Sequence, residues 1–253
     1  MKILAIGNSF SHDAHMYQKM LADAVGADLE IMNANIGGCT LETHAKNVRE
    51  GNRSYIIQYN GKEIDESVKC TIDEALAFRK WDYVTVQQVS GLSGVWETYL
   101  PYMDVLVDRI RALCPMAKIV IHQTWAYEHG SQHQDFYRYS HDPEVMTNAL
   151  TDAYERAAAH IGAVGIIPTG KVIQSLRNLP EFDVRAGGVS LHRDGFHLSY
   201  DYGRFAAAAV WHVAFGLGDV SKNPAVPDGE DLDTGLLDII RSTVMREVEP
   251  IIK

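Results

Sequence analysis

The sequence is poor in cysteine and contains no long apolar run. Its three cysteines (Cys39, Cys70 and Cys114) are odd in number and widely spaced, which excludes a disulfide framework and a Cys-x-x-Cys metal site. No stretch approaches the roughly 18 consecutive apolar residues that a membrane-spanning helix needs. The first residues lack the basic segment followed by an apolar one that is typical of a secretory leader. We therefore expect a cytoplasmic protein, and a secreted or periplasmic one stays open if a leader precedes residue 1.

Basic residues are also scarce. Lys and Arg together number 23 against 33 for Asp and Glu, which gives a formal net charge of -10. An acidic surface repels nucleic-acid phosphates and anionic lipid headgroups, so we expect neither nucleic acid nor a membrane among the partners. A neutral small-molecule substrate is compatible with this charge, and the sequence leaves the oligomeric state open.

The distribution of apolar residues predicts an α/β fold. Longer amphipathic segments alternate with five short apolar runs, at residues 2–7, 29–35, 83–88, 117–123 and 164–167. Such runs are typical of parallel strands that are covered by helices on both faces. The simplest arrangement is a single domain over 1–253, built as a flavodoxin-like three-layer α/β/α sandwich with a five-stranded parallel sheet in the order 2-1-3-4-5.

Between these strands the sequence predicts one hairpin and eight helices. Asn60-Gly61 stands between two β-prone runs, which indicates a type I′ β-hairpin inserted near residues 53–66. Residues 127–141 show no clear period and are expected to form a long loop. The helices are expected at 15–25, 41–50, 71–79, 100–113, 143–161, 171–178, 199–215 and 231–248.

A serine follows the first predicted strand, in the segment Gly7-Asn8-Ser9-Phe10-Ser11. A hydroxyl at this place lies at the carboxyl end of a strand and next to a helix N-terminus, where backbone N–H groups favour negative charge. Ser9 is therefore a candidate nucleophile. The alternative is that Ser9 or Ser11 merely caps the helix.

A carboxylate and an imidazole stand three residues apart near the end of the chain, as Asp194 and His197. A carboxylate that orients an imidazole is what a serine nucleophile needs as its base. The spacing alone can be incidental, and His192 is a competing base. However, Ser9 and this pair should both lie at the carboxyl edge of one sheet, so the two motifs together predict one site.

These motifs resemble those of the SGNH, or GDSL-like, hydrolase superfamily. Gly7-Asn8-Ser9 is similar to its first block and Asp194-Gly195-Phe196-His197 to its last. The segment from Asn33 to Thr40 is similar to the second block, with Gly38 in the functional position. The resemblance implies that Ser9 is the nucleophile, that His197 and Asp194 complete a triad, and that the N–H groups of Ser9 and Gly38 form an oxyanion hole. It implies no metal and no cofactor.

One block departs from the family pattern. The superfamily usually has Gly-x-Asn-Asp after the third strand, with Asn as an oxyanion donor, whereas this chain has Gln87-Gln88-Val89-Ser90. Carbohydrate O-acetylesterase branches are more similar here, and the chain also resembles a bacterial subgroup of unknown function. The resemblance suggests Gln88 as the donor, with Ser90 as the alternative, since a Gln amide can replace an Asn amide. At least one of the two glutamines can instead only tie down neighbouring loops.

Two aromatic residues, Trp125 and Tyr127, follow the fourth strand at the same sheet edge. We expect them, with Ser90, to line the substrate pocket, although Trp125 can instead simply cover the sheet end. The resulting hypothesis is a serine esterase that acts on a small acyl ester, most simply an O-acetyl group on a carbohydrate. Its rivals are a catalytically degenerate glycan-binding protein with the same fold and, in the absence of a Gly-rich phosphate loop, less readily a phosphate-handling enzyme.

Overall fold

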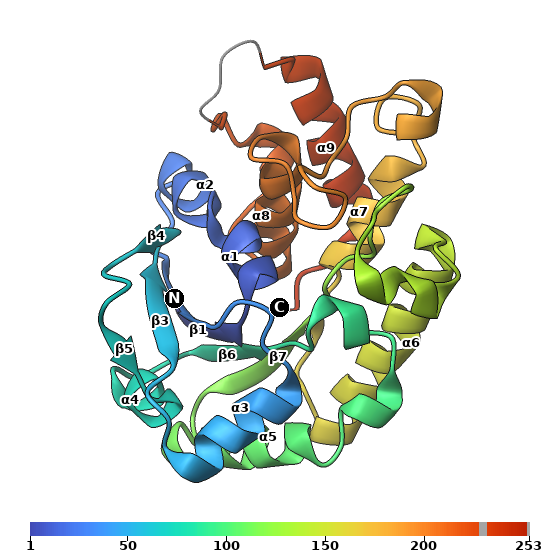
Figure 1. Cartoon of the computed structure of the whole chain (residues 1–253). Coiled ribbons are helices and arrows are strands. Elements are labelled where there is room, and N and C mark those ends of the chain that lie inside the picture. The colour runs from blue at the N-terminus through green and yellow to red at the C-terminus, as the bar shows by residue number, and fades with distance from the viewer. Residues whose placement is uncertain (228–231, 252–253) are drawn as a thin grey trace.

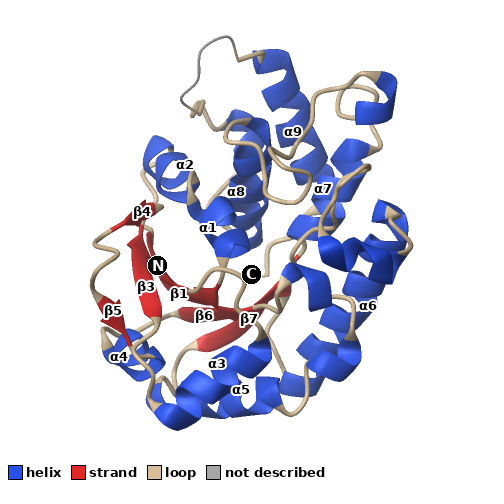
Figure 2. Cartoon of the chain, in the orientation of Figure 1, coloured by secondary structure: helices blue, strands red, loops and turns tan. Residues whose placement is uncertain are grey.

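A parallel five-stranded sheet forms the centre of the molecule. The computed structural model describes residues 1–227 and 232–251. It shows the predicted α/β/α sandwich, with the parallel strands adjacent in the predicted order (Figures 1 and 2). In spatial order the strands are β2 (Glu30–Asn35), β1 (Lys2–Gly7), β6 (Tyr83–Val86), β7 (Lys118–His122) and β8 (Ile166–Ile167).

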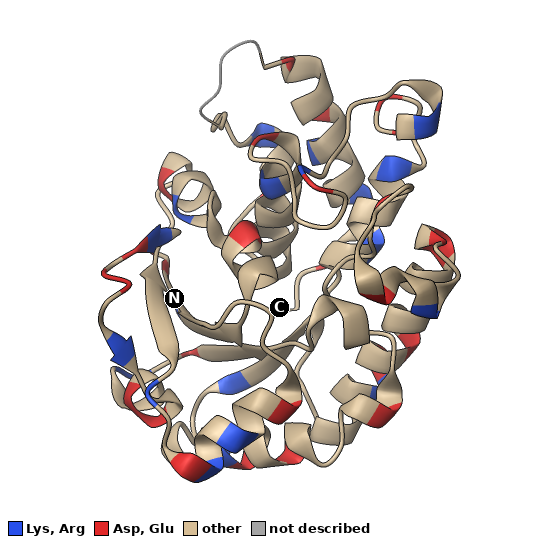
Figure 3. Cartoon of the chain, in the orientation of Figure 1, with Lys and Arg blue, Asp and Glu red and all other residues tan. Residues whose placement is uncertain are grey.

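The inner strands carry charged residues only at the end where a strand begins. In β1, β2 and β7 the only Lys, Arg, Asp or Glu is the first residue, and β6 has none. Figure 3 shows the same pattern, with charged residues mainly on the helices and connecting segments. Because helices cover both faces, charge is tolerated only where a strand enters the sheet. The opposite, carboxyl ends of β1, β6 and β7 lead into polar, uncharged residues, Asn8, Gln87 and Gln123.

The predicted hairpin is present and extends the sheet. It consists of β3 (Tyr55–Tyr59) and β4 (Lys62–Glu63), and both turn residues, Asn60 and Gly61, have positive φ, as a type I′ turn requires. Strand β3 pairs antiparallel with β2, and β5 (Lys69–Cys70) pairs with β3. The insertion therefore covers the open edge of β2.

Two helical layers enclose the sheet (Figure 1). The first contains α1 and α2, which pack against α8, with α7 and α9 packed on α8 in turn. The other contains α3, α4, α5 and α6, and hydrogen bonds from Arg111 and His160 connect α5 with α6. The bounds are α1 (Ser9–His15), α2 (Gln18–Ala24), α3 (Leu41–Glu50), α4 (Ile72–Ala77), α5 (Tyr102–Leu113), α6 (Pro143–Ile161), α7 (Thr169–Arg177), α8 (Tyr202–Ala214) and α9 (Thr234–Glu247).

The structure differs from the sequence predictions at three helices or loops. The helix expected at 15–25 is α2, Gln18–Ala24, and a separate helix, α1, precedes it, beginning at Ser9 because Asn8 caps it. The loop expected at 127–141 contains a 3₁₀ helix, Gln134–Tyr139. The last helix was expected from residue 231, which lies outside the described residues, and α9 begins at Thr234. No helix in the described part of the chain is long and apolar enough to cross a membrane.

Candidate active site

Ser9 is the first residue of α1, directly after β1. The side chain of Asn8, not of Ser9 or Ser11, caps the helix by accepting a hydrogen bond from Phe10 N at 3.0 Å. The capping interpretation of the two serines is therefore wrong, and the Ser9 hydroxyl is left for another partner. The tight turn also needs Gly7, because a Cβ there would lie 2.2 Å from Ser11 Oγ.

That partner is His197. Its Nε2 lies 2.9 Å from Ser9 Oγ, and its Nδ1 lies 2.7 Å from Asp194 Oδ2. Because an ionised carboxylate can only accept, Nδ1 carries the imidazole proton and Nε2 is left to accept the proton of the Ser9 hydroxyl. Residues 188 positions apart in the chain thus meet in the arrangement that activates a serine.

The local backbone keeps Asp194 ionised. Partial burial acts against the charged form, but hydrogen bonds from the His197 ring and from the backbone N–H groups of His197 and Phe196 outweigh it and lower the pKa of Asp194. The backbone donors both contact Oδ1, at 2.7 and 3.1 Å, which leaves Oδ2 to the imidazole. The turn itself therefore fixes the carboxylate in the orientation that His197 requires.

A chain of buried polar side chains holds the turn before Ser9. Gln87 Nε2 donates to Asn8 Oδ1 at 2.8 Å, and His122 Nδ1 lies 2.7 Å from Gln87 Oε1. Burial lowers the pKa of His122 to about 3, so this ring is neutral and donates its Nδ1–H to Gln87. The sequence analysis left open that Gln87 ties down neighbouring loops, but it did not predict the contact of Gln87 with Asn8. The available signal was their position at the carboxyl ends of β1 and β6.

Two backbone donors lie beside the nucleophile. Within the described residues, neither the N–H of Ser9 nor the N–H of Gly38 has an acceptor in the protein. Gly38 is exposed and has a φ of +62°, a conformation that favours glycine. Its loop is held against the Ser9 turn, because Asn8 Nδ2 donates to Cys39 O and Ile36 N donates to Gly7 O. Both N–H groups are thus available to an anion.

Comparisons with known proteins show the family of this chain. A family model described as "Domain of unknown function (DUF4886)" matches residues 2–238. The chain belongs to the DUF4886 family. The crystal structure of a DUF4886 family protein from Bacteroides uniformis is 35% identical and covers 97% of this chain and 93% of its own, with a TM-score of 0.88. A comparison with curated proteins gives no match.

More distant structures place this DUF4886 protein in the SGNH-like superfamily. A protein from Slackia heliotrinireducens, described as a candidate SGNH hydrolase, is 26% identical over 83% of this chain and 96% of its own, with a TM-score of 0.55. A protein from Parabacteroides merdae, described as a candidate GDSL-like lipase, has the same fold at 15% identity, with a TM-score of 0.55 over 86% and 96% of the two chains. The superfamily predicted from the sequence motifs is confirmed.

The structure corrects the prediction that Gln88 is an oxyanion donor in this DUF4886 protein. The side chain is fully buried, and its Nε2 donates to Thr98 O and Thr98 Oγ1, each at 3.1 Å. Its Oε1 accepts from Leu41 N and Val89 N. Both amide hydrogens are therefore occupied, and Gln88 ties three loops together.

The predicted pocket residues Trp125 and Tyr127 are also corrected. Both side chains are completely buried, so neither can contact a substrate in this conformation. Trp125 stacks on Phe10 and covers the sheet end, as the alternative interpretation held. The Tyr127 hydroxyl lies 2.9 Å from Ser90 Oγ, and Ser90 itself is almost completely buried. A role for Ser90 in substrate binding or as an oxyanion donor stays a prediction.

His192, the competing base, is not brought to Ser9. It is buried, with Nδ1 3.4 Å from Glu128 Oε1, and burial lowers its pKa more than Glu128 raises it. Ser190 completes this cluster by donating to Glu128. These residues connect the loop that carries Asp194 and His197 to the segment after β7.

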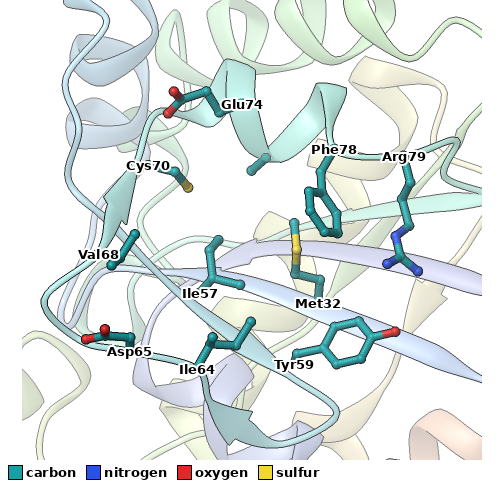
Figure 4. Close-up of a pocket in the computed structure, with 11 residues that line it drawn as sticks. Met32, Ile57, Tyr59, Ile64, Asp65, Val68, Cys70, Glu74, Phe78 and Arg79 are labelled. Atoms are coloured by element: carbon teal, nitrogen blue, oxygen red, sulfur yellow. The ribbon is translucent and has the colours of Figure 1, made fainter.

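A cavity of about 650 Å³ lies away from the triad, between α4 and the strands β2 and β3 (Figure 4). Apolar side chains, including Met32, Ile57, Val68 and Phe78, form most of its wall. The carboxylate of Glu74 at its edge is paired with Arg53. The cavity contains no serine and no histidine, so we place the candidate active site at Ser9.

Proposed function

We propose that this DUF4886 protein is a serine esterase in which Ser9 is the nucleophile, His197 the general base and Asp194 the residue that orients the base. The observation that carries this proposal is the continuous Ser9–His197–Asp194 hydrogen-bond chain, with heavy-atom distances of 2.9 and 2.7 Å. A nucleophile within reach of a base that a third group orients is the general geometry of covalent acyl transfer.

The reaction takes two steps. His197 Nε2 accepts the proton of Ser9 as Oγ attacks the ester carbonyl, and the protonated imidazole then gives that proton to the leaving alcohol oxygen. The product is an acyl-enzyme on Ser9. In the second step His197 removes a proton from water, the resulting hydroxide attacks the acyl carbon, and Ser9 Oγ recovers the proton as the acid leaves.

The N–H groups of Ser9 and Gly38 are the proposed oxyanion donors. Each lacks an acceptor within the described residues, and the Ser9 N–H belongs to the first turn of α1, where the helix field favours negative charge. Such fixed donors stabilise the tetrahedral intermediate without reorganisation, and losing one typically lowers the rate by about 100- to 1000-fold.

The substrate proposed is a small acyl ester, most simply an O-acetyl group on a carbohydrate. The site is open, since Ser9 and His197 are half-buried and Gly37 and Gly38 are exposed. The half-buried rings of Phe196 and His133 lie 4.8 Å apart beside His197, and form an aromatic surface against which the apolar face of a sugar can pack. We therefore propose that Phe196 and His133, rather than Trp125 and Tyr127, are the aromatic residues that contact the sugar.

Hydrolysis of p-nitrophenyl acetate by the wild type and by Ser9→Ala tests the proposal. We expect turnover that the substitution removes, together with labelling of Ser9 by a fluorophosphonate in the wild type. Turnover that survives in Ser9→Ala would show that Ser9 is not the nucleophile. No turnover and no labelling of the wild type would favour the rival hypothesis of a glycan-binding protein without catalysis.

A further inference from the structure

A buried carboxylate lies one helical turn after the nucleophile. Asp13 is the fifth residue of α1, and Ser9 is the first, so the two residues are separated by about one turn of the same helix. The residue is 1% exposed. A buried charge of this kind is costly unless it is paired and hydrogen-bonded, so its partners explain why it is there.

The partners of Asp13 flank the segment Asp194–His197 on both sides. Arg193, directly before Asp194, donates from Nη1 to both carboxylate oxygens at 3.0 and 3.1 Å. Leu198, directly after His197, donates from its backbone N–H to Oδ2 at 3.0 Å. Arg193 also donates to Leu198 O, which closes the base of the loop. Arg204 of α8 supplies the remaining contacts, at 2.7 and 2.8 Å.

We propose that Asp13 is a positioning residue that sets the distance between Ser9 and His197; this inference rests on the proposed function. The Asp13 carboxylate on α1 is hydrogen-bonded to residues at both ends of the loop that carries Asp194 and His197. The same short helix carries Ser9, the nucleophile. The charge-assisted bonds from Arg193 and Arg204 are among the stronger hydrogen bonds in proteins. The nucleophile and its base, far apart in sequence, are therefore held by one rigid connection.

The middle of the loop is held independently from another direction. Trp125 Nε1 donates to Phe196 O at 2.8 Å, and Glu128 N donates to Gly195 O at 2.8 Å. These contacts fix the loop to the segment after β7, which in turn meets α1 through the apolar stack of Trp125 on Phe10. Without Asp13, the loop would keep its place on that segment, but its charged connection to the helix that carries Ser9 would be lost and the distance from His197 to Ser9 would shift. A misplacement of about 1 Å can lower a rate by about 100-fold.

Asp13→Asn tests the proposal, because Asn preserves the size of the side chain but removes its charge and turns one acceptor oxygen into a donor. We expect kcat with p-nitrophenyl acetate to fall by about 100-fold with KM changed less than about threefold, the pattern expected when reacting groups lose alignment. Asp73→Asn is the matched control. It removes an Asp–Arg pair between α4 and α5 in the other helical layer, and kcat should stay unchanged.

A second readout does not need turnover. The proton that His197 Nδ1 shares with Asp194 gives a strongly deshielded proton NMR signal only while the pair is held, and its absence in His197→Gln assigns it. The turn and the contacts from Trp125 and Glu128 hold this pair without Asp13, so we expect the signal in both the wild type and Asp13→Asn, which shows that the loop is intact. The distance from Ser9 Oγ to His197 Nε2 in a crystal structure of Asp13→Asn tests the register itself, and we expect it to be longer than in the wild type by about 1 Å. If the wild type shows no turnover, the proposed esterase is wrong and this distance still tests Asp13.

A folded Asp13→Asn protein that keeps both the Ser9–His197 distance and the wild-type kcat would overturn the proposal. If circular dichroism shows that this variant does not fold, Arg193→Gln takes its place, because it leaves Asp13 paired with Arg204 and Leu198 N. We expect Arg193→Gln to lengthen the Ser9–His197 distance and to lower kcat by about tenfold, which corresponds to roughly 1.4 kcal/mol. An unchanged distance and kcat in Arg193→Gln would overturn the proposal equally.

Discussion

The ring of Trp125 stacks on the ring of Phe10, with centroids 4.3 Å apart and an interplanar angle of 8°. Phe10 is the neighbour of the candidate nucleophile, and Trp125 Nε1 also donates to the backbone carbonyl of Phe196, the neighbour of the candidate base. One buried indole therefore contacts both the residue next to the candidate nucleophile and the residue next to the candidate base. Its contacts are with the protein, and its effect on a substrate can only be indirect.

Replacement of Trp125 by Phe separates its two contacts. Trp125→Phe keeps an aromatic ring against Phe10 but leaves the Phe196 carbonyl without its donor, which typically costs about 1–3 kcal/mol where the acceptor is buried. We expect a lower urea midpoint and a kcat reduced several-fold with little change in KM. Trp96→Phe, distant from the triad, is the control and should leave kcat unchanged. A rise in KM alone would instead indicate that Trp125 contacts the substrate.

Asp194→Asn should impair catalysis while leaving the turn intact. The Asn oxygen can still accept from the N–H groups of Phe196 and His197, but its amide would donate to His197 Nδ1 and place the imidazole proton on Nε2, facing Ser9. In the serine protease template the equivalent change lowers kcat by about 10⁴-fold. Turnover of p-nitrophenyl acetate measures the effect, with Asp183→Asn, at a half-buried carboxylate paired with Arg185, as the control. A loss below tenfold would contradict the assigned role.

The stability of the fold should depend on the ionisation of Asp194. Because its pKa is lower in the folded protein than in the unfolded chain, Asp194 stabilises the fold above the ordinary carboxyl pKa of about 3.9, and this contribution is lost as the pH falls through the folded-state pKa. The free energy of unfolding of the wild type should therefore exceed that of Asp194→Asn at pH 7, with a smaller difference at strongly acidic pH. Urea titrations at both pH values measure it. A difference that grows on acidification would contradict the direction of the shift.

Gln88→Leu distinguishes a structural side chain from an oxyanion donor. The substitution leaves the buried N–H of Leu41, the partly buried N–H of Val89 and the carbonyl of Thr98 without partners. We expect a loss of at least about 3 kcal/mol in the free energy of unfolding, since each of the three unpaired groups costs roughly 1–3 kcal/mol, with kcat within tenfold of the wild type. The opposite pattern, normal stability with a 100- to 1000-fold lower kcat, would restore Gln88 as a donor.

Much of the fold could be predicted because its signals are local. A strand such as β1 is recognised by an uninterrupted apolar run, and the β3–β4 hairpin by Asn60-Gly61, since both depend on a few consecutive residues. The start of α1 at Ser9 was missed because Asn8, rather than a serine, provides the cap. The assignment needed the side-chain contact, since Asn and Ser are both good capping residues.

For the site, the sequence by itself identified the three residues that we propose carry the chemistry. Ser9 after the first strand and Asp194 with His197 after the last were recognisable from their spacing and from the sheet edge that they share. The tertiary structure decided what surrounds them. In the folded chain the amide of Gln88 donates to Thr98, the side chains of Trp125 and Tyr127 are buried, and Asp13 accepts hydrogen bonds from Arg193 and Leu198. A side chain's reach is a few ångströms, so its partners depend on how distant segments pack, and no local pattern in the sequence records that.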